Sequence, residues 1–337
     1  VKRLRAIAAS MTGFGGQVEI ATTSANPQLA ALQATCAATP LPGAAGTSSC
    51  FNIRVEACVA VPGVGLEANC QNKYSGVPKP EGLIQQYNND MRFAALGYLN
   101  VANGTRNGAA LRSAMKSVGP NAATKIGVVP NPAPEWNTTT GVMFTNPDPA
   151  DAAASAVTNS GLMNYLNKFG YYAANAGSST PYKNYDPVSE MYYAATRYFR
   201  NLGDVPEYSS ISNAGSTGTM NTWVDGFPIV RSWRDPMVYS CQRNFILGIG
   251  DIYTHRDTNL PGSTIKTSDE PTTPASVDAD TAINVKTATD MVGQLEGLSN
   301  LGSNRGPRND SQFIAGLAYH THTTDIRADL DRGLSSI

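Results

Sequence analysis

The hydrophobic pattern predicts strands in the first half of the chain. Residues Phe51–Val59 alternate between apolar and polar side chains, which is typical of a half-exposed strand. Met91–Leu99 is nearly all apolar and predicts a strand inside a sheet. Asn103–Gly108 has hairpin-turn residues, so we expect an antiparallel partner strand at Leu111–Val118.

Helical spacing alternates with these strands. Ser160–Gly170 places its apolar residues on one helix face. The best helix signal has Asp186 as N-cap, Pro187 at the first helical position and Gly203 after the last turn. Shorter helices are predicted at Pro80–Tyr87, Ala282–Leu298 and Ser311–His320. The alternation predicts an α/β fold, a three-layer sandwich with β-hairpin and loop insertions.

One later stretch predicts the centre of this sheet. Phe245–Ile249 is a short apolar run with branched residues, and Asp251 follows it closely. A buried strand that carries a carboxylate to the carboxyl edge of an α/β sheet has this pattern, and ligands gather at that edge. We therefore take Asp251 as the centre of the candidate site.

The remaining segments are predicted to be irregular. We expect loops at residues 204–236 and 258–279 and an irregular segment at Cys70–Pro80. The domain organisation that we predict is an irregular amino-terminal segment at 1–50, one domain with insertions at 51–331 and a tail at 332–337. A chain of 337 residues suits one large domain of this kind or two smaller ones.

The amino-acid composition indicates the cellular location of the protein. Charged residues make up only 15%, against about 25% in an average soluble domain, and small and polar residues replace them. This suits a secreted or surface protein. The net charge of -1 does not favour nucleic acid or an anionic membrane. No apolar run reaches about 18 residues, so no membrane span is predicted. The start at Val1 suggests a processed or internal piece of a larger secreted protein.

Five cysteines support an oxidising compartment. Because no CxxC pair occurs, the pattern argues against zinc and for two local disulfides. We favour Cys36 with Cys50 and Cys58 with Cys70, since each pair closes a short loop, but three pairings of these four are open. Cys241 is left over at the head of an apolar run and is expected to be a buried free thiol.

Several stretches together resemble the amino-terminal part of the type IV pilus tip-associated biogenesis proteins, the bacterial tip-adhesin family. The most specific part is Cys241–Asp251, followed by Thr254–His255 and Asn259–Gly262. The resemblance covers most of residues 50–331 and little of 1–49. Its other segments are Tyr74–Asn100, Leu111–Asn121, Glu135–Leu166, Asp186–Gly203, Trp223–Gly262, Phe313–Tyr319 and Thr324–Arg327.

The resemblance implies a von Willebrand factor A-like, Rossmann-type domain, normally followed by a β-propeller that is absent from this sequence. Such domains can hold Mg²⁺ or Ca²⁺ through an Asp-x-Ser-x-Ser loop, a threonine and an aspartate at a strand end. Asp251 matches the aspartate, and Asp186 stands where the threonine would be. The Asp-x-Ser-x-Ser loop does not occur here. The alternative is that Asp251 binds backbone amides and Asp186 caps its helix.

The resemblance also implies a non-enzymatic protein that supports pilus assembly and surface adhesion. Its expected partners are minor pilins or pilin-like proteins and a host or abiotic surface. The expected location is extracellular, at the pilus tip or the bacterial outer surface, after transit through the periplasm. A tyrosine-rich loop is a candidate partner surface, with core packing as the alternative. Its members are Tyr171, Tyr172, Tyr182 and Tyr185.

Other chemistry is weakly signalled. His255, His320 and His322 could bind a transition metal with Asp257, or could be ordinary surface histidines. The chain has no Gly-x-Ser-x-Gly elbow, no phosphate loop and no His-Glu-x-x-His. Two alternatives to a pilus tip protein stay open: a secreted hydrolase that uses the Asp251 edge, and a structural subunit of an extracellular fibre or capsid.

Overall fold

The computed structural model describes most of the chain from residue 58 onward. It divides into two compact units, Val1–Pro80 and Glu81–Ile337, and each is described by itself. The predicted boundary at residue 50 stays a prediction. The described residues are 58–60, 62–101, 107–124, 127–173, 185–250, 254–266, 270–306 and 310–330.

The first unit contains a hairpin where the sequence predicted an irregular segment. Strands β1 (Cys70–Tyr74) and β2 (Val77–Pro80) pair antiparallel. The turn between them has Ser75 at φ 51° and Gly76 at φ 75°. Two successive residues with positive φ form the tight turn whose twist matches that of paired strands. The expectation of an irregular Cys70–Pro80 segment was therefore wrong, because the turn chemistry at Ser75 and Gly76 was not recognised.

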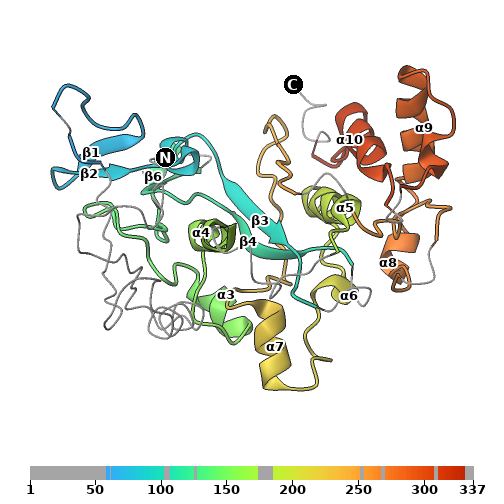
Figure 1. Ribbon diagram of the computed structural model, residues 1–337, viewed down its shortest axis with the longest axis horizontal. Helices are drawn as coiled ribbons and strands as arrows, with labels where there is room; N and C mark the ends of the chain where they lie inside the picture. Colours follow the sequence, from blue (N-terminus) through green and yellow to red (C-terminus); the bar gives the residue numbers. More distant parts are fainter. Residues whose placement is uncertain are drawn as a thin grey trace, which may run out of the picture. The chain divides into compact units, whose positions relative to one another are not determined.

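The second unit contains the predicted hairpin. Strands β3 and β4 pair antiparallel, with Gly97 opposite Ala110 and Leu96 opposite Leu111. Helices α4 and α5 contact this pair, as Figure 1 shows. A second hairpin, β5 with β6, follows directly and was not predicted. These elements are β3 (Phe93–Gly97), β4 (Ala110–Lys116), β5 (Asn121–Thr124), β6 (Gly127–Pro130), α4 (Leu162–Ala173) and α5 (Val188–Phe199).

Helix α4 lies close against the hairpin because a glycine leaves room for it. A Cβ on Gly97 would come within 1.8 Å of the hydroxyl of Tyr165. The start of α4 is held by the buried carboxylate of Glu135, which accepts the backbone N–H groups of Leu162 (2.8 Å) and Met163 (2.6 Å). A carboxylate at this position satisfies the free amides of the first turn and suits the helix dipole.

The other helices occupy both predicted helical segments and predicted loops. Two of them, α6 and α7, lie within residues 204–236, where a loop was expected. Helix α7 begins after Ser216, whose Oγ accepts the backbone N–H of Thr219 at 3.1 Å. These helices are α2 (Leu83–Gln86), α3 (Pro149–Ala154), α6 (Pro206–Ser209), α7 (Thr217–Val224), α8 (Ala275–Asp278), α9 (Val285–Leu295), the 3-10 helix η1 (Leu301–Ser303) and α10 (Phe313–Thr323).

An apolar core joins α5, α6, α8, α9 and α10. Helices α9 and α10 pack on each other (Figure 1), and α10 also contacts α5. Each large aliphatic or aromatic side chain buried here stabilises the fold by roughly 1.5–3 kcal/mol. The buried members are Tyr193, Val205, Tyr208, Leu260, Ile265, Val277, Ile283, Val285, Phe313 and Leu317.

The predicted central strand is absent from the structure. Residues Phe245–Ile249 belong to no strand, and Phe245, Leu247 and Ile249 are 75%, 86% and 88% exposed. Cys241 is exposed rather than buried. Apolar content indicates that a segment favours burial, but it does not supply the neighbouring strand. The von Willebrand A-like sandwich stays a prediction.

Candidate functional site

Asp186 lies beside His255 instead of capping α5. Its Oδ1 is 2.6 Å from His255 Nδ1, and both side chains are largely buried. The N-cap of α5 is Pro187, which offers no side-chain hydrogen bond. The prediction that Asp186 caps this helix was therefore wrong. Its carboxylate contacts a histidine from a distant segment instead.

Tyr185 packs against the same histidine. Its ring is stacked on that of His255, with the centroids 5.2 Å apart, and the guanidinium of Arg256 lies 4.3 Å from the tyrosine centroid. Stacking and cation–π contacts of this kind hold an aromatic ring in place. Tyr185 is thus part of a packed cluster. Of the other predicted partner-binding residues, Tyr171 and Tyr172 lie on α4 with side chains outside the described part, and Tyr182 lies outside it altogether.

A fully buried carboxylate, Glu190, joins three segments near this cluster. It accepts hydrogen bonds from Asn107 Nδ2 (3.1 Å) and from the backbone N–H groups of Gly108 (2.9 Å) and Asn259 (3.0 Å). Burial, reinforced by the charge of Glu270, raises the pKa of Glu190 well above its ordinary value, although the N–H groups of Asn259 and Gly108 oppose the shift.

Asp257 is a second buried carboxylate with structural partners. It accepts the Ser189 hydroxyl at 2.5 Å and the backbone N–H of Ser311 at 2.6 Å. Burial raises its pKa despite these bonds. Asp257 thereby ties the first turn of α5 to the segment that begins α10.

The charges of these carboxylates act on the side chain of Tyr98. Its hydroxyl is buried and has no hydrogen-bond partner in the described structure. Burial raises its pKa, and the charges of Asp186, Glu190 and Asp257 raise it further. We call these three acids the carboxylate cluster. The sequence analysis did not single out Glu190. The signal that could have identified it is a carboxylate on a helix whose other residues are mostly buried.

A cation at the predicted position has incomplete support from the described residues. Asp251 lies outside them, and the carboxylate of Asp186 is engaged with His255. Cys58, Glu67 and Cys70 form the one group of three potential ligands found in the described part. Both sulfur atoms of that group are in a disulfide, so they are not the thiolates that bind metals. The described residues therefore do not by themselves form a metal site, either at Asp186 or at the group of Cys58, Glu67 and Cys70.

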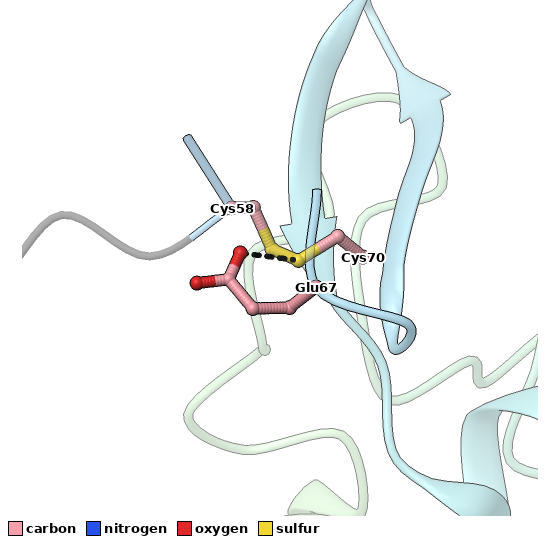
Figure 2. Close-up of side chains that lie close together, drawn as sticks. All are labelled: Cys58, Glu67 and Cys70. Atoms are coloured by element: carbon pink, nitrogen blue, oxygen red, sulfur yellow. Dashed lines mark hydrogen bonds between the residues drawn. A yellow bond between two sulfur atoms is a disulfide. The ribbon is translucent and has the colours of Figure 1, made fainter. Parts of the chain in front are cut away.

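The disulfide that was favoured from the sequence is present. Cys58 and Cys70 are bonded, with their Cα atoms 5.5 Å apart. Figure 2 shows the carboxylate of Glu67 turned toward this bond, with Oε2 3.5 Å from Cys70 Sγ. A disulfide sulfur carries no proton, so we interpret this as a close contact. Cys36 and Cys50 lie outside the described residues.

The histidines do not gather with Asp257 as a metal site in the described structure. His320 and His322 lie in the last turn of α10, and burial lowers the pKa of His320. His255 is the partner of Asp186. Among the described residues, we find no helix that combines the length and the apolar character needed to cross a bilayer.

Comparison with known proteins places the chain in a family. The family model described as "PilY1 homolog, second domain" matches residues 103–313. The Type IV pilus biogenesis factor PilY1 homolog of Xylella fastidiosa (strain Temecula1) is 41% identical over 299 residues, covering 83% of this chain and 24% of that protein.

The chain thus spans about a quarter of the length of this relative. No solved structure matches it. The part of the chain that matches is the one described by the model of the second domain. Because this family model covers more than half of the sequence, the chain belongs to the PilY1-like type IV pilus family.

Proposed function

We propose that this chain is a binding domain of a type IV pilus tip protein, and that it supports pilus assembly and surface adhesion without catalysis. The observation that carries this proposal is the family match over residues 103–313. The relative from Xylella fastidiosa is named a pilus biogenesis factor, and that role comes to this chain as part of the proposal.

Two acids of the carboxylate cluster have structural partners, which supports a bracing role for them. Glu190 and Asp257 are fully buried and accept backbone N–H groups from distant segments. Buried carboxylates with such partners brace a fold. In this proposal α5, the β3–β4 hairpin and α10 form a rigid frame, and the exposed loops contact partners.

The partners that we propose are pilus components, specifically minor pilins or pilin-like proteins, together with a host or abiotic surface. The site of action is outside the cell, at the pilus tip or the outer surface. The Cys58–Cys70 disulfide is consistent with this location, because disulfides persist in oxidising compartments. We also keep the von Willebrand A-like fold as a proposal, since the family resemblance includes it.

The cation remains a separate part of the proposal. A hard divalent ion, Mg²⁺ or Ca²⁺, would take oxygen ligands from Asp186 and Asp251. For Asp186 to bind it, the carboxylate must give up or share its contact with His255.

The test is an in-frame deletion of residues 103–313 from the gene that encodes the chain. Electron microscopy counts surface pili, and an attachment assay on cells with equal pilus numbers measures adhesion. We expect fewer pili, weaker attachment, or both. Asp278→Ala, at an exposed position on α8, is the matched control and should behave as the native gene. Normal pili with normal attachment in the deletion strain would refute the proposal.

A further inference from the structure

Asn107 and Gly108 are buried together where the chain enters β4. Asn107 is 6% exposed, and Gly108 has a φ of 70°, in the left-handed region that glycine adopts without strain. A Cβ on Gly108 would come within 2.2 Å of the ring of Tyr208, so only glycine fits at this position. The backbone nitrogen of Gly108 therefore has no side chain on its own residue to keep it away from the Asn107 amide.

The buried carboxylate of Glu190 contacts a nitrogen of each residue. Its Oε2 accepts the backbone N–H of Gly108 at 2.9 Å, and its Oε1 accepts Asn107 Nδ2 at 3.1 Å. The two nitrogens therefore lie side by side on the two oxygens of one carboxylate. A base in this position can take a proton from one nitrogen and return it to the other.

Further contacts hold these groups in place. Asn107 Nδ2 also donates to the carbonyl of Arg256 at 3.3 Å, and Glu190 Oε1 also accepts the backbone N–H of Asn259 at 3.0 Å. Groups that are already oriented lose little rotational freedom when they react. Burial of Glu190, reinforced by the charge of Glu270, raises its pKa, so its carboxylate is a stronger base than an exposed one.

We propose that Asn107 and Gly108 close into a cyclic imide in the folded chain, with Glu190 as the catalytic residue. Glu190 Oε2 takes the proton of the Gly108 nitrogen, whose electron pair forms a bond to Asn107 Cγ. The carboxyl group returns this proton to Nδ2 as the Cγ–Nδ2 bond breaks. The products are the imide and one ammonia molecule, so no co-reactant is consumed. The reaction occurs once within the chain and turns over no substrate.

The imide would fix the backbone at the entry to β4. Closure removes the Gly108 N–H and the Asn107 amide, so that Glu190 keeps the N–H of Asn259 as its donor. Opening of the ring requires water, and the burial of Asn107 restricts access of water to it. We therefore expect the ring to persist in the folded chain and to hydrolyse to aspartate or isoaspartate after unfolding.

The first test compares the folded chain with the chain unfolded in urea. Trypsin cleaves after Arg106 and Arg112, so the Asn107–Gly108 pair is recovered in a short peptide of its own. Mass spectrometry measures conversion over time, counting the imide together with its hydrolysis products. We expect faster conversion in the folded chain. Slower conversion there would show that the fold protects Asn107, and would overturn the proposal.

Glu190→Gln tests the catalytic residue. It should slow the conversion of Asn107 in the folded chain about a hundredfold and leave the rate in urea unchanged. The Asn103–Gly104 pair, recovered in a separate tryptic peptide, is the internal control and should convert equally in both chains. Equal rates at Asn107 would exclude Glu190. Circular dichroism checks the fold of the variant, and if it fails to fold, the comparison in urea still decides the proposal.

The intact mass of the chain tests which atom attacks. Attack by the Gly108 nitrogen keeps the chain whole and lowers its mass by one ammonia. Attack by Asn107 Nδ2 on its own backbone carbonyl carbon would instead break the chain between these two residues. Recovery of fragments that end at Asn107 and begin at Gly108 would contradict the proposed step. Asn107→Gln, which lengthens the side chain, should abolish the loss of ammonia at this site.

Discussion

Asp257 Oδ1 accepts a hydrogen bond of 2.6 Å from the backbone N–H of Ser311, which lies 54 positions further along the chain. Ser311 also donates its hydroxyl to the Asp257 carbonyl at 3.2 Å. Both residues are buried, so water cannot easily replace either bond. This double contact fixes where α10 begins relative to the loop that follows residue 254.

Asp257→Ala should therefore destabilise the fold. It would leave the buried Ser311 N–H and the Ser189 hydroxyl without their acceptor. We expect a loss of about 2–4 kcal/mol in the free energy of unfolding. Urea unfolding followed by circular dichroism measures it.

The control for this change is Asp278→Ala, an exposed carboxylate on α8. Its effect should stay within about 0.5 kcal/mol. Equal stabilities for the two variants would show that the Asp257 bonds contribute nothing net.

Glu190 makes stability depend on pH. Burial raises its folded-state pKa well above the ordinary value of 4.5, so the folded chain keeps this proton to higher pH than the unfolded chain does. The contribution is fully present below pH 4.5 and is lost as pH rises toward the folded pKa. Glu190→Gln removes the titration.

The stability of the native chain relative to Glu190→Gln should therefore fall as pH increases above about 4.5. Urea unfolding of both chains at several pH values provides this difference. Glu207→Gln, at an exposed position on α6, is the matched control. A difference between native and Glu190→Gln that does not change with pH would contradict the buried ionisation.

The Cys58–Cys70 disulfide should stabilise the hairpin of the first unit. It closes a short loop, with a sequence separation of 12, and such a cross-link restricts the unfolded chain by about 3 kcal/mol. Replacing both cysteines with serine should speed proteolytic cleavage between residues 62 and 80. Limited proteolysis with mass spectrometry measures the rate.

Cys241→Ser is the matched control, because that thiol is free and exposed. It should leave the cleavage rate unchanged. Mapping of non-reduced peptides should recover the Cys58 and Cys70 peptides joined. Recovery of Cys58 joined to a different cysteine would contradict the structure.

The proposed cation predicts heat of binding when Mg²⁺ or Ca²⁺ is titrated into the chain. Asp251→Ala should abolish it, because a hard ion loses a carboxylate ligand. Asp186→Asn should weaken it as well. Calorimetry of all three chains decides the matter: absent binding, or unchanged binding in Asp251→Ala, removes the metal from the proposal.

Local patterns predicted several elements well. Helix α4 was expected at Ser160–Gly170 and runs over Leu162–Ala173, and the β3–β4 hairpin follows its predicted turn. Helices α9 and α10 also lie within or close to their predicted segments. Helical and alternating periodicities depend on neighbours a few residues apart, so one segment of sequence contains the whole signal.

The partners of the candidate site residues could not be predicted from local sequence patterns. Asp186 was expected to cap α5, and its partner is His255, 69 positions away. Glu190 was not singled out, although it accepts the backbone N–H of Asn259. Partners this distant are set by how α5 packs, and periodicity along one helix does not encode that.

The sequence by itself determined where the chain can form helices and hairpins, which cysteines can close short loops, and the family resemblance. Tertiary structure alone decided which buried carboxylate meets which amide, as with Asp257 and Ser311. It also decided that Phe245–Ile249 is exposed. The physical reason is that an apolar run records a preference for burial, whereas burial itself requires a neighbouring surface from elsewhere in the chain or from another molecule.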